Sequence, residues 1–390
     1  SDLIIFPASV LVVDKVYGLV YLIVILLGIW QMIVHRKEIF PISKDERFFF
    51  FSLSIVMVTV VITTIANDTD MARADRFLAP ILAIPAYIFF KRNLLNEKYV
   101  WFGLLIATLI VLSVAIYQVS YLTYCPINPI RASGAVHKII FGDLTLLMGV
   151  MMLASVGWFW RINKWFIIIP FISFVSGIVA SSLSLTRGAW LAVPFFILIF
   201  IWYLPKNIPF KYTVLVLGVF LSVVGTIYLA PHFNVQSRVG MTVNNINAYF
   251  ESESMTDPAR KTSIGQRIEM WRAALIMFYE NPWVGVGWGE YSSKIQQLVN
   301  NGEVHKALSV YYHPHNQFIS ALAKGGVMGF MATCIFFIIP GLLFYKGIGA
   351  SSVLMVRRFA LMGLILMTGF VIFGLTEAIL ERSRSIIFFS

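Results

Sequence analysis

Two histidines, His313 and His315, flank a proline in the segment Tyr312-His313-Pro314-His315-Asn316. The segment ends a long polar stretch of the chain and precedes an apolar one. An imidazole titrates near neutral pH, so it can take a proton from a hydroxyl group or donate a hydrogen bond to a phosphate oxygen. Histidines at helix starts also serve as caps and structural contacts. The segment therefore predicts either acid–base chemistry or a cap at the start of an apolar helix.

Residues 184–190 form a turn between two apolar stretches and can hold an anion. A helix that begins in this turn, with Thr186 as its cap, presents free backbone N–H groups and partial positive charge. Arg187 adds a full positive charge beside them. The alternative is an interfacial arginine that reaches phospholipid head groups. Because this turn and the histidine segment both open helices from the same side, we expect the two to converge.

The polar stretch before the histidines contains an amphipathic helix, expected over residues 262–280. Ser263 and Gln266 predict a capping box at its start. Arg267 and Trp271 are four residues apart and share one face. Such a helix lies along the membrane surface or covers a space between membrane helices. Its apolar residues recur at helical spacing: Ile264, Ile268, Trp271, Leu275 and Phe278.

The run that follows, 283–289, alternates three glycines with apolar residues. Glycine allows close backbone approach, so we interpret the run as a packing segment rather than a phosphate loop. Residues 291–300 predict one more short surface helix. Trp271, Trp283 and Trp288 have two interpretations, stacking on sugars or anchoring at the membrane interface, and anchoring is the favoured one.

Composition sets the class of protein that must hold these segments. The 390 residues are 59% hydrophobic and 13% charged, whereas soluble domains are about 25% charged. Runs such as 48–66 and 99–119 match the ~20 residues that cross a bilayer as a helix. We predict an all-α polytopic membrane protein of about twelve transmembrane helices. The expected spans are 16–34, 48–66, 72–90, 99–120, 136–157, 164–183, 188–204, 211–230, 325–346 and 354–375, with partial helices at 3–13 and 385–389.

The net charge of +11 resides mainly in short turns and not in one polar domain, which argues against a nucleic-acid partner. Lys and Arg in short loops stay on the cytoplasmic side. The basic turns are 35–47, 91–98, 158–164, 205–211 and 346–358. This pattern predicts cytoplasmic termini, with residues 231–315 outside between an N-terminal bundle, 1–230, and C-terminal helices, 316–390. Basic residues that fall on the outer side need another reason: Arg73, Arg76, Arg131, Lys138 and Arg187.

Three boxes of this sequence resemble the O-antigen ligase family. His315-Asn316, nine residues, Gly326, two residues and Gly329 resemble its signature, and residues 184–190 and 267–271 resemble its other two boxes. The resemblance covers nearly the whole chain and extends to a superfamily shared with O-antigen polymerases and protein O-oligosaccharyltransferases. Polymerases match the three boxes less well, and the oligosaccharyltransferases commonly have a longer C-terminal extension. The ligase is therefore the favoured member.

The resemblance implies a GT-C-like glycosyltransferase of the bacterial inner membrane, with one large periplasmic loop of amphipathic helices. It implies transfer of a glycan from undecaprenyl diphosphate to a hydroxyl of the lipid A-core oligosaccharide on the periplasmic face. The bilayer is the third partner. His315 would take the acceptor proton or orient the acceptor. The implied diphosphate ligands are Arg187 and Arg267, with Arg76 or Arg73 as a weaker third contact. The implied acceptor or sugar contacts are His313, Asn316, Trp271 and Tyr312.

No metal or cofactor is expected in this reaction. A diphosphate is a good leaving group, and two arginines can neutralise its developing charge as bidentate donors. Asp68-Thr69-Asp70, in another outer loop, reads as a solvated turn rather than a metal site. The reaction would be a direct displacement with inversion at the anomeric carbon.

A transporter of lipid-linked glycans or small molecules is the alternative from a different class. Transporters place ionisable groups or broken helices near the bilayer midplane. Here the acids in apolar stretches, Asp143 and Glu377, are expected near the outer surface, and Lys324 lies near a helix start. Because the polar residues are expected at the periplasmic edge and not at the bilayer midplane, an enzyme is favoured over a transporter.

Overall fold

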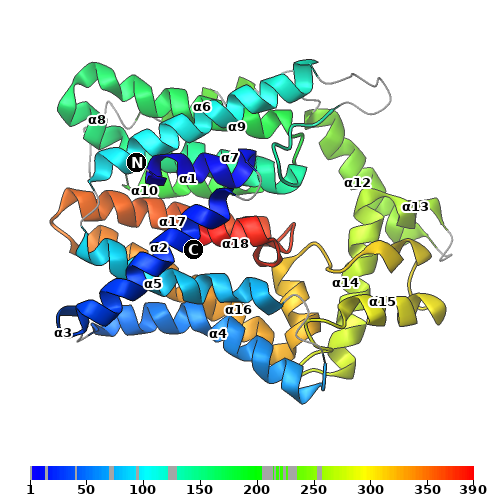
Figure 1. The fold of residues 1–390 in the computed structure, drawn as a ribbon. Coiled ribbons are helices and arrows are strands. Elements are labelled where there is room, and N and C mark those ends of the chain that lie inside the picture. Colours follow the sequence, from blue (N-terminus) through cyan, green and yellow to red (C-terminus); the bar gives the residue numbers. More distant parts are fainter. Residues whose placement is uncertain are drawn as a thin grey trace.

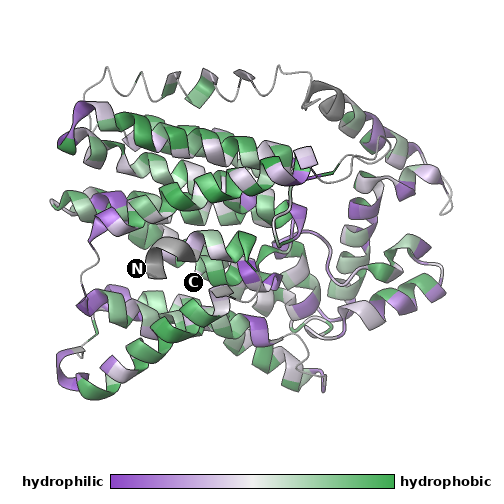
Figure 2. Ribbon diagram, turned by 45° about the horizontal axis from the view of Figure 1, so that its top comes forward, coloured by the Kyte–Doolittle hydropathy of each residue, from purple (hydrophilic) through white to green (hydrophobic). Residues whose placement is uncertain are grey.

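The computed structural model describes residues 2–13, 16–39, 42–69, 74–93, 96–121, 130–203, 235–252 and 257–390, with short pieces at 214, 217–218, 220–222 and 225–226. Every regular element in these ranges is helical. Figure 1 shows long helices lying side by side, with a group of shorter helices at one end of the bundle. Figure 2 shows that apolar residues dominate the bundle and polar residues concentrate in that end group. The all-α prediction is confirmed for the described ranges.

Seven helical stretches in the described part of the chain are long and apolar enough to cross a membrane. The protein is therefore a multi-pass membrane protein. The stretch Lys138–Ile162 is central, because 94% of its apolar window is buried inside the protein. The seven are Tyr17–Val34 in α2 (Val16–Val34), α4 (Lys44–Ala66), α6 (Glu97–Tyr121), Lys138–Ile162 with α7 (Lys138–Met152) and α8 (Val156–Ile162), Lys164–Leu183 with α9 (Ile168–Leu183), α16 (Gln317–Ala350) and α17 (Leu354–Gly374).

Other expected spans are shorter than predicted. Instead of one helix over 72–90, a 3-10 turn, Ala74–Leu78, leads into α5 (Ala79–Arg92), which has 14 residues. The expected helix 188–204 is a shorter apolar helix, Ala189–Tyr203, that ends in α10 (Val193–Tyr203). Most of 211–230 lies outside the described residues. The two partial helices are α1 (Asp2–Val12) and α18 (Ser383–Phe389), so the count of about twelve stays a prediction.

Helix α16 begins eight residues before the expected 325, at Gln317. Its cap is Asn316, whose side-chain oxygen accepts hydrogen bonds from the Phe318 and Ile319 N–H groups at 3.0 and 3.1 Å. At Gly326 the backbone has φ 59° and ψ −155°, which interrupts the helix. Gly326 divides α16 into two segments, and the expected span 325–346 corresponds to the second of them.

The glycine run 283–289 packs against the interruption in α16. The Val286 N–H donates to the Ala323 carbonyl at 3.0 Å, and the Val327 N–H donates to the Pro282 carbonyl at 2.8 Å. A Cβ added at Gly326 would lie 2.4 Å from the carbonyl carbon of Trp283. The predicted packing role of the glycine run is therefore confirmed.

The end group consists of α12 (Val235–Glu251), α13 (Pro258–Lys261), α14 (Ser263–Glu280) and α15 (Tyr291–Asn300) (Figure 1). Helices α14 and α15 occupy the predicted ranges. The cap of α14 is Thr262, whose hydroxyl accepts a hydrogen bond from the Gly265 N–H at 3.0 Å. The predicted capping box from Ser263 and Gln266 is wrong, because the residue three positions after the true cap is a glycine without a side chain.

A buried carboxylate, Glu269, holds the end group together. It accepts hydrogen bonds from the Tyr249 hydroxyl of α12 at 2.6 Å and from the His305 N–H at 3.2 Å, and it pairs with Arg260 of α13. A buried carboxylate with several partners fixes the elements that supply them. Helix α14 is thereby held as a rigid support for the residues on its other face.

Candidate active site

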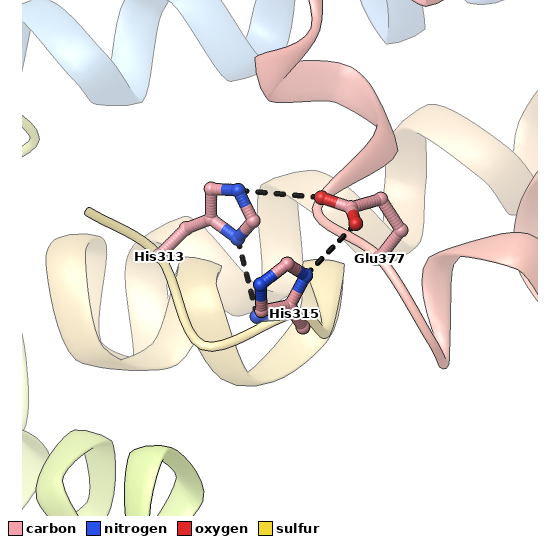
Figure 3. A group of neighbouring side chains, drawn as sticks. All are labelled: His313, His315 and Glu377. Atoms are coloured by element: carbon pink, nitrogen blue, oxygen red, sulfur yellow. Dashed lines mark hydrogen bonds and ion pairs between the residues drawn. The ribbon is translucent and has the colours of Figure 1, made fainter. Parts of the chain in front are cut away.

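The histidine segment meets the segment that follows α17 at a buried carboxylate, Glu377 (Figure 3). His315 Nδ1 lies 2.8 Å from Glu377 Oε2, and His313 Nε2 lies 3.2 Å from Glu377 Oε1. His315 has φ 49°, a left-handed conformation that is uncommon outside glycine, although histidine is one of the residues that adopt it more often than most. Such strain occurs at sites where the surroundings over-determine the backbone. The positive φ of His315 therefore accompanies a turn in which both imidazoles contact the same carboxylate.

The hydrogen bonds of His313 define its tautomer. Its Nδ1 accepts a hydrogen bond from the His315 backbone N–H at 3.2 Å, so the ring proton is on Nε2, which donates to Glu377. Burial lowers the pKa of His313 to about 3, although the charges of Glu377 and Glu381 oppose this shift. His313 is therefore a neutral residue with both ring nitrogens engaged, and it positions Glu377 and the turn.

Glu377 is an ionised carboxylate that orients His315. Burial alone would raise its pKa, but the hydrogen bond from His315 and the positive charge of Arg382 lower it below the usual range. Arg382 Nη2 lies 3.1 Å from Glu377 Oε1. A carboxylate at Nδ1 places the neutral ring's proton there and leaves the lone pair on Nε2. His315 Nε2 has no hydrogen-bond partner in the described part of the chain, so it can accept a proton from a substrate.

The same three residues have the composition of a metal site, because their ligand atoms lie within 4.8 Å of one another. Zinc would need nitrogen and oxygen ligands at about 2.0–2.2 Å, all directed at the ion. Here the histidine nitrogens direct their protons at Glu377, and the guanidinium of Arg382 already supplies positive charge to that carboxylate. These contacts favour proton transfer over metal binding.

Tyr312 connects this cluster to a second one. Its hydroxyl accepts a hydrogen bond from Arg382 Nη1, and the guanidinium lies 5.5 Å from the centre of its ring. Its backbone carbonyl accepts a hydrogen bond from Lys324 Nζ at 3.1 Å. The residue predicted as an acceptor contact is thus held through its side chain by Arg382 and through its backbone by Lys324.

The second cluster is a buried ion pair between Lys324 of α16 and Glu381, with Nζ 2.6 Å from Oε2. The Ser320 hydroxyl also bonds to Glu381. Arg76, predicted to contact the diphosphate, donates to the backbone carbonyl of Glu381. These contacts hold the segment that carries Glu377 and Arg382 against the first turns of α16.

Arg267 projects from α14 toward the cluster and is half-buried. Burial lowers its pKa, whereas the carboxylates of Glu377 and Asp143 raise it, which places both acids within electrostatic range. Arg267 makes no hydrogen bond or ion pair with any residue that the structure describes. Its N–H groups are available for an anion. Asp143, on α7, is fully buried, and neither carboxylate oxygen has a hydrogen-bond partner among the described residues.

The turn that carries Arg187 lies directly beside the segment that carries Glu377. A Cβ added at Gly188 would lie 2.4 Å from the hydroxyl oxygen of Thr376. Arg187 itself is exposed. Thr186 does not cap a helix as predicted, because its hydroxyl donates to the Lys138 carbonyl at 3.0 Å and ties the turn to the start of α7. The predicted convergence of this turn with the histidine segment is confirmed.

Two other predicted contacts have structural partners. The Asn316 amide donates to the Leu375 carbonyl at 3.1 Å, in addition to capping α16. Trp271 Nε1 donates to the Pro314 carbonyl at 3.0 Å, which joins α14 to the histidine turn. Both residues brace the turn in this structure. Arg73 lies outside the described residues.

Sequence reasoning assigned no site role to Glu377, Arg382, Lys324 or Glu381. The available signal was four charged residues, at 377, 381, 382 and 384, within an otherwise apolar stretch that runs from 359 to 389. Charged groups in such a setting are expensive unless they are paired or functional. The sequence did not show which residue pairs with each of these charged side chains.

Two comparisons relate this chain to known proteins. The chain is 23% identical, over 385 residues, to an uncharacterized protein of Haemophilus influenzae, with 98% of this chain and 94% of that protein covered. Residues 172–334 match the model of a family described as O-antigen ligase, and this range contains the turn with Arg187, the helix with Arg267 and both histidines. The resemblance seen in the sequence is therefore confirmed over residues 172–334, which are similar to the O-antigen ligase family.

Proposed function

We propose that this protein is an O-antigen ligase that transfers a glycan from undecaprenyl diphosphate to a hydroxyl of the lipid A-core oligosaccharide. The observation that carries the proposal is the hydrogen bond of His315 Nδ1 to the buried carboxylate of Glu377, which leaves Nε2 as a base, while Arg267 lies within electrostatic range of the same carboxylate. A base and an anion site side by side are what transfer from a diphosphate to a hydroxyl requires.

In the proposed reaction the acceptor hydroxyl attacks the anomeric carbon of the donor sugar. Its proton moves to His315 Nε2 as the new glycosidic bond forms. The bond from the anomeric carbon to the phosphate oxygen breaks, and its electron pair leaves with undecaprenyl diphosphate. Glu377 stabilises the positive charge that His315 acquires. One displacement of this kind inverts the anomeric carbon and involves no covalent intermediate; a trapped glycosyl-enzyme adduct would contradict it.

We assign Arg267 and Arg187 to the diphosphate. Arg267 is half-buried and keeps its donors free of protein partners in the described chain. A guanidinium in such surroundings binds phosphate oxygens with two parallel hydrogen bonds and strengthens as charge develops on the leaving group. Arg76 holds the backbone at Glu381, so we propose a supporting role for it.

The proposed orientation puts α12–α15 and the candidate site in the periplasm and both termini in the cytoplasm. It rests on the Lys- and Arg-rich turns at the opposite ends of the helices. The polyprenyl and lipid A tails then remain in the bilayer while their polar heads meet under α14.

The test is glycan transfer by the purified protein from undecaprenyl diphosphate to rough lipopolysaccharide in the presence of EDTA. We expect the wild type to be active and His315→Ala to be folded and inactive. His35→Ala is the matched control, because His35 follows α2 at the end of the bundle opposite α14 (Figure 1) and is expected to leave the rate unchanged.

Each other outcome points to a different function. Loss of wild-type activity in EDTA would contradict the metal-free mechanism. Growth of glycan chains without transfer to lipopolysaccharide would indicate a polymerase, and modification of a protein acceptor would indicate an oligosaccharyltransferase. No transfer to any acceptor would favour a transporter.

A further inference from the structure

A group of basic residues borders the candidate active site but takes no part in the mechanism above. Arg131, His137 and Lys138 precede or begin α7, and we call them the basic rim. Arg131 and Lys138 are on the side of the membrane where the topology pattern expects few basic residues. Basic residues kept against that tendency need a function of their own.

Backbone and side-chain contacts bring the basic rim next to the turn that carries Arg187. The Ala132 N–H donates to the Leu183 carbonyl at 3.1 Å, and the Thr186 hydroxyl donates to the Lys138 carbonyl at 3.0 Å. Gln118 Oε1 accepts hydrogen bonds from the N–H groups of residues 133 and 134, both at 2.9 Å, which fixes the loop. The backbone that carries the rim residues is therefore fixed beside the turn of Arg187.

The basic rim is accessible and strongly positive. Arg131 and His137 are exposed, and Lys138 is half-exposed. Residues 130–138 and 184–190 contain no aspartate or glutamate. Burial lowers the pKa of His137, and the charges of Arg382 and Lys138 lower it further, against the effect of Glu377. That dependence also shows that the rim lies within electrostatic range of the Glu377 cluster.

The donor's diphosphate does not need these charges. It carries about two negative charges, which Arg187 and Arg267 already match in the proposed function. The basic rim adds two more full positive charges at an exposed edge, from Arg131 and Lys138, where a second anionic group would be neutralised. The acceptor glycolipid approaches from the same leaflet and must bring its hydroxyl to His315.

We propose that the basic rim binds a phosphate group that the acceptor glycolipid carries near its accepting hydroxyl. The inference rests on the proposed function and specifies its acceptor as an anionic, phosphorylated glycolipid. Phosphate binding at a fixed distance from His315 orients the accepting sugar in the absence of the donor. Removing the rim charges therefore weakens acceptor binding and leaves donor binding intact.

The test compares the wild type with the double variant Arg131→Gln/Lys138→Gln in nanodiscs. The measurement is the Kd for rough lipopolysaccharide, native and chemically dephosphorylated, without donor. We expect the double variant to bind the native acceptor at least about tenfold more weakly and the dephosphorylated acceptor as the wild type does. The control Lys261→Gln/Lys306→Gln removes the same charge from exposed positions of the end group and should change neither Kd.

Several outcomes would overturn the proposal. Equal weakening toward both acceptors would indicate a structural role for the rim. A raised donor KM with unchanged acceptor Kd would assign the rim to the diphosphate, and a change only in nanodiscs rich in phosphatidylglycerol would assign it to bilayer head groups. The Kd for the acceptor is measured without donor. A wild type that binds the acceptor as expected but transfers no glycan would therefore contradict the proposed function, but not the assignment of phosphate binding to the basic rim.

Discussion

His315 and Glu377 are 62 residues apart in sequence, yet Nδ1 of one lies 2.8 Å from Oε2 of the other. The histidine comes just before α16, and the glutamate comes just after α17. These two helices pack against each other, and a short connection between them returns the chain to the same end of the bundle. The pair joins two segments that an antiparallel helical hairpin brings together.

Glu377→Gln tests that pair. The amide is nearly isosteric but carries no charge, so it cannot stabilise the imidazolium that forms when His315 takes a proton. We expect kcat for glycan transfer to fall at least about a hundredfold with a smaller change in donor KM. Glu303→Gln, an exposed glutamate of the end group, is the matched control. A kcat within a few fold of the wild type would remove Glu377 from the mechanism.

Acidification is expected to destabilise the protein through His313. Burial lowers its pKa to about 3 in the fold, whereas an imidazole in the unfolded chain titrates near ~6.5. Between these values the unfolded chain binds one more proton. The stabilisation is thus complete above pH ~6.5 and is lost toward lower pH, by up to about 1.4 kcal/mol per pH unit.

The measurement is the melting temperature in detergent between about pH 7.5 and about pH 4.5. The wild type should lose stability more steeply than His313→Asn, whose side chain does not titrate. Parallel curves for the two proteins would show that His313 is not held neutral.

Gly326→Ala should destabilise the fold at the interruption of α16. The backbone conformation there is nearly exclusive to glycine, and the added Cβ would lie 2.4 Å from the Trp283 carbonyl carbon. We expect a loss of about 2–4 kcal/mol, measured by thermal unfolding. Gly349→Ala, in the same helix with no atom within 4 Å of the new methyl, should be neutral or stabilising by up to about 1 kcal/mol. Equal effects at both glycines would rule out the packing explanation.

Lys324 and Glu381 should behave as a coupled pair. Lys324→Met leaves a buried carboxylate without its partner, and we expect it to lower stability by about 3–5 kcal/mol. Adding Glu381→Gln removes the uncompensated charge and keeps a hydrogen-bonding group for Ser320. The double variant should therefore be more stable than Lys324→Met alone. Additive losses in the double-mutant cycle would show that the two side chains do not depend on each other.

Much of the fold was predictable because it depends on local patterns. The long apolar runs predicted α2, α6 and α17 closely, and periodicity predicted α14 and α15, whereas α4 begins at Lys44, before the expected residue 48. The predicted helix caps at Ser263 and Thr186 were wrong. The cap of α14 lies one residue earlier, at Thr262, and the Thr186 hydroxyl donates to the Lys138 carbonyl instead of capping a helix. Short helices with prolines, such as α5, also departed from the expected length.

The candidate site was predictable only where its residues lie in recognisable segments. His315, Arg187 and Arg267 were singled out in this way. The structure places His315 and Arg267 near Glu377 and the turn of Arg187 beside Thr376. The carboxylate and Arg382 were missed because their role depends on which helix ends meet. Long-range pairing of this kind is decided by packing and not by neighbouring residues.

The position of Glu377 after α17 also sets the order of events during biosynthesis. Ribosomes add about 5–20 residues per second, so the 62 residues between His315 and Glu377 take roughly 3–12 s to make. During that interval the nascent chain contains both histidines but lacks the carboxylate that orients them. The candidate site is therefore completed only as the last helical hairpin closes in the bilayer.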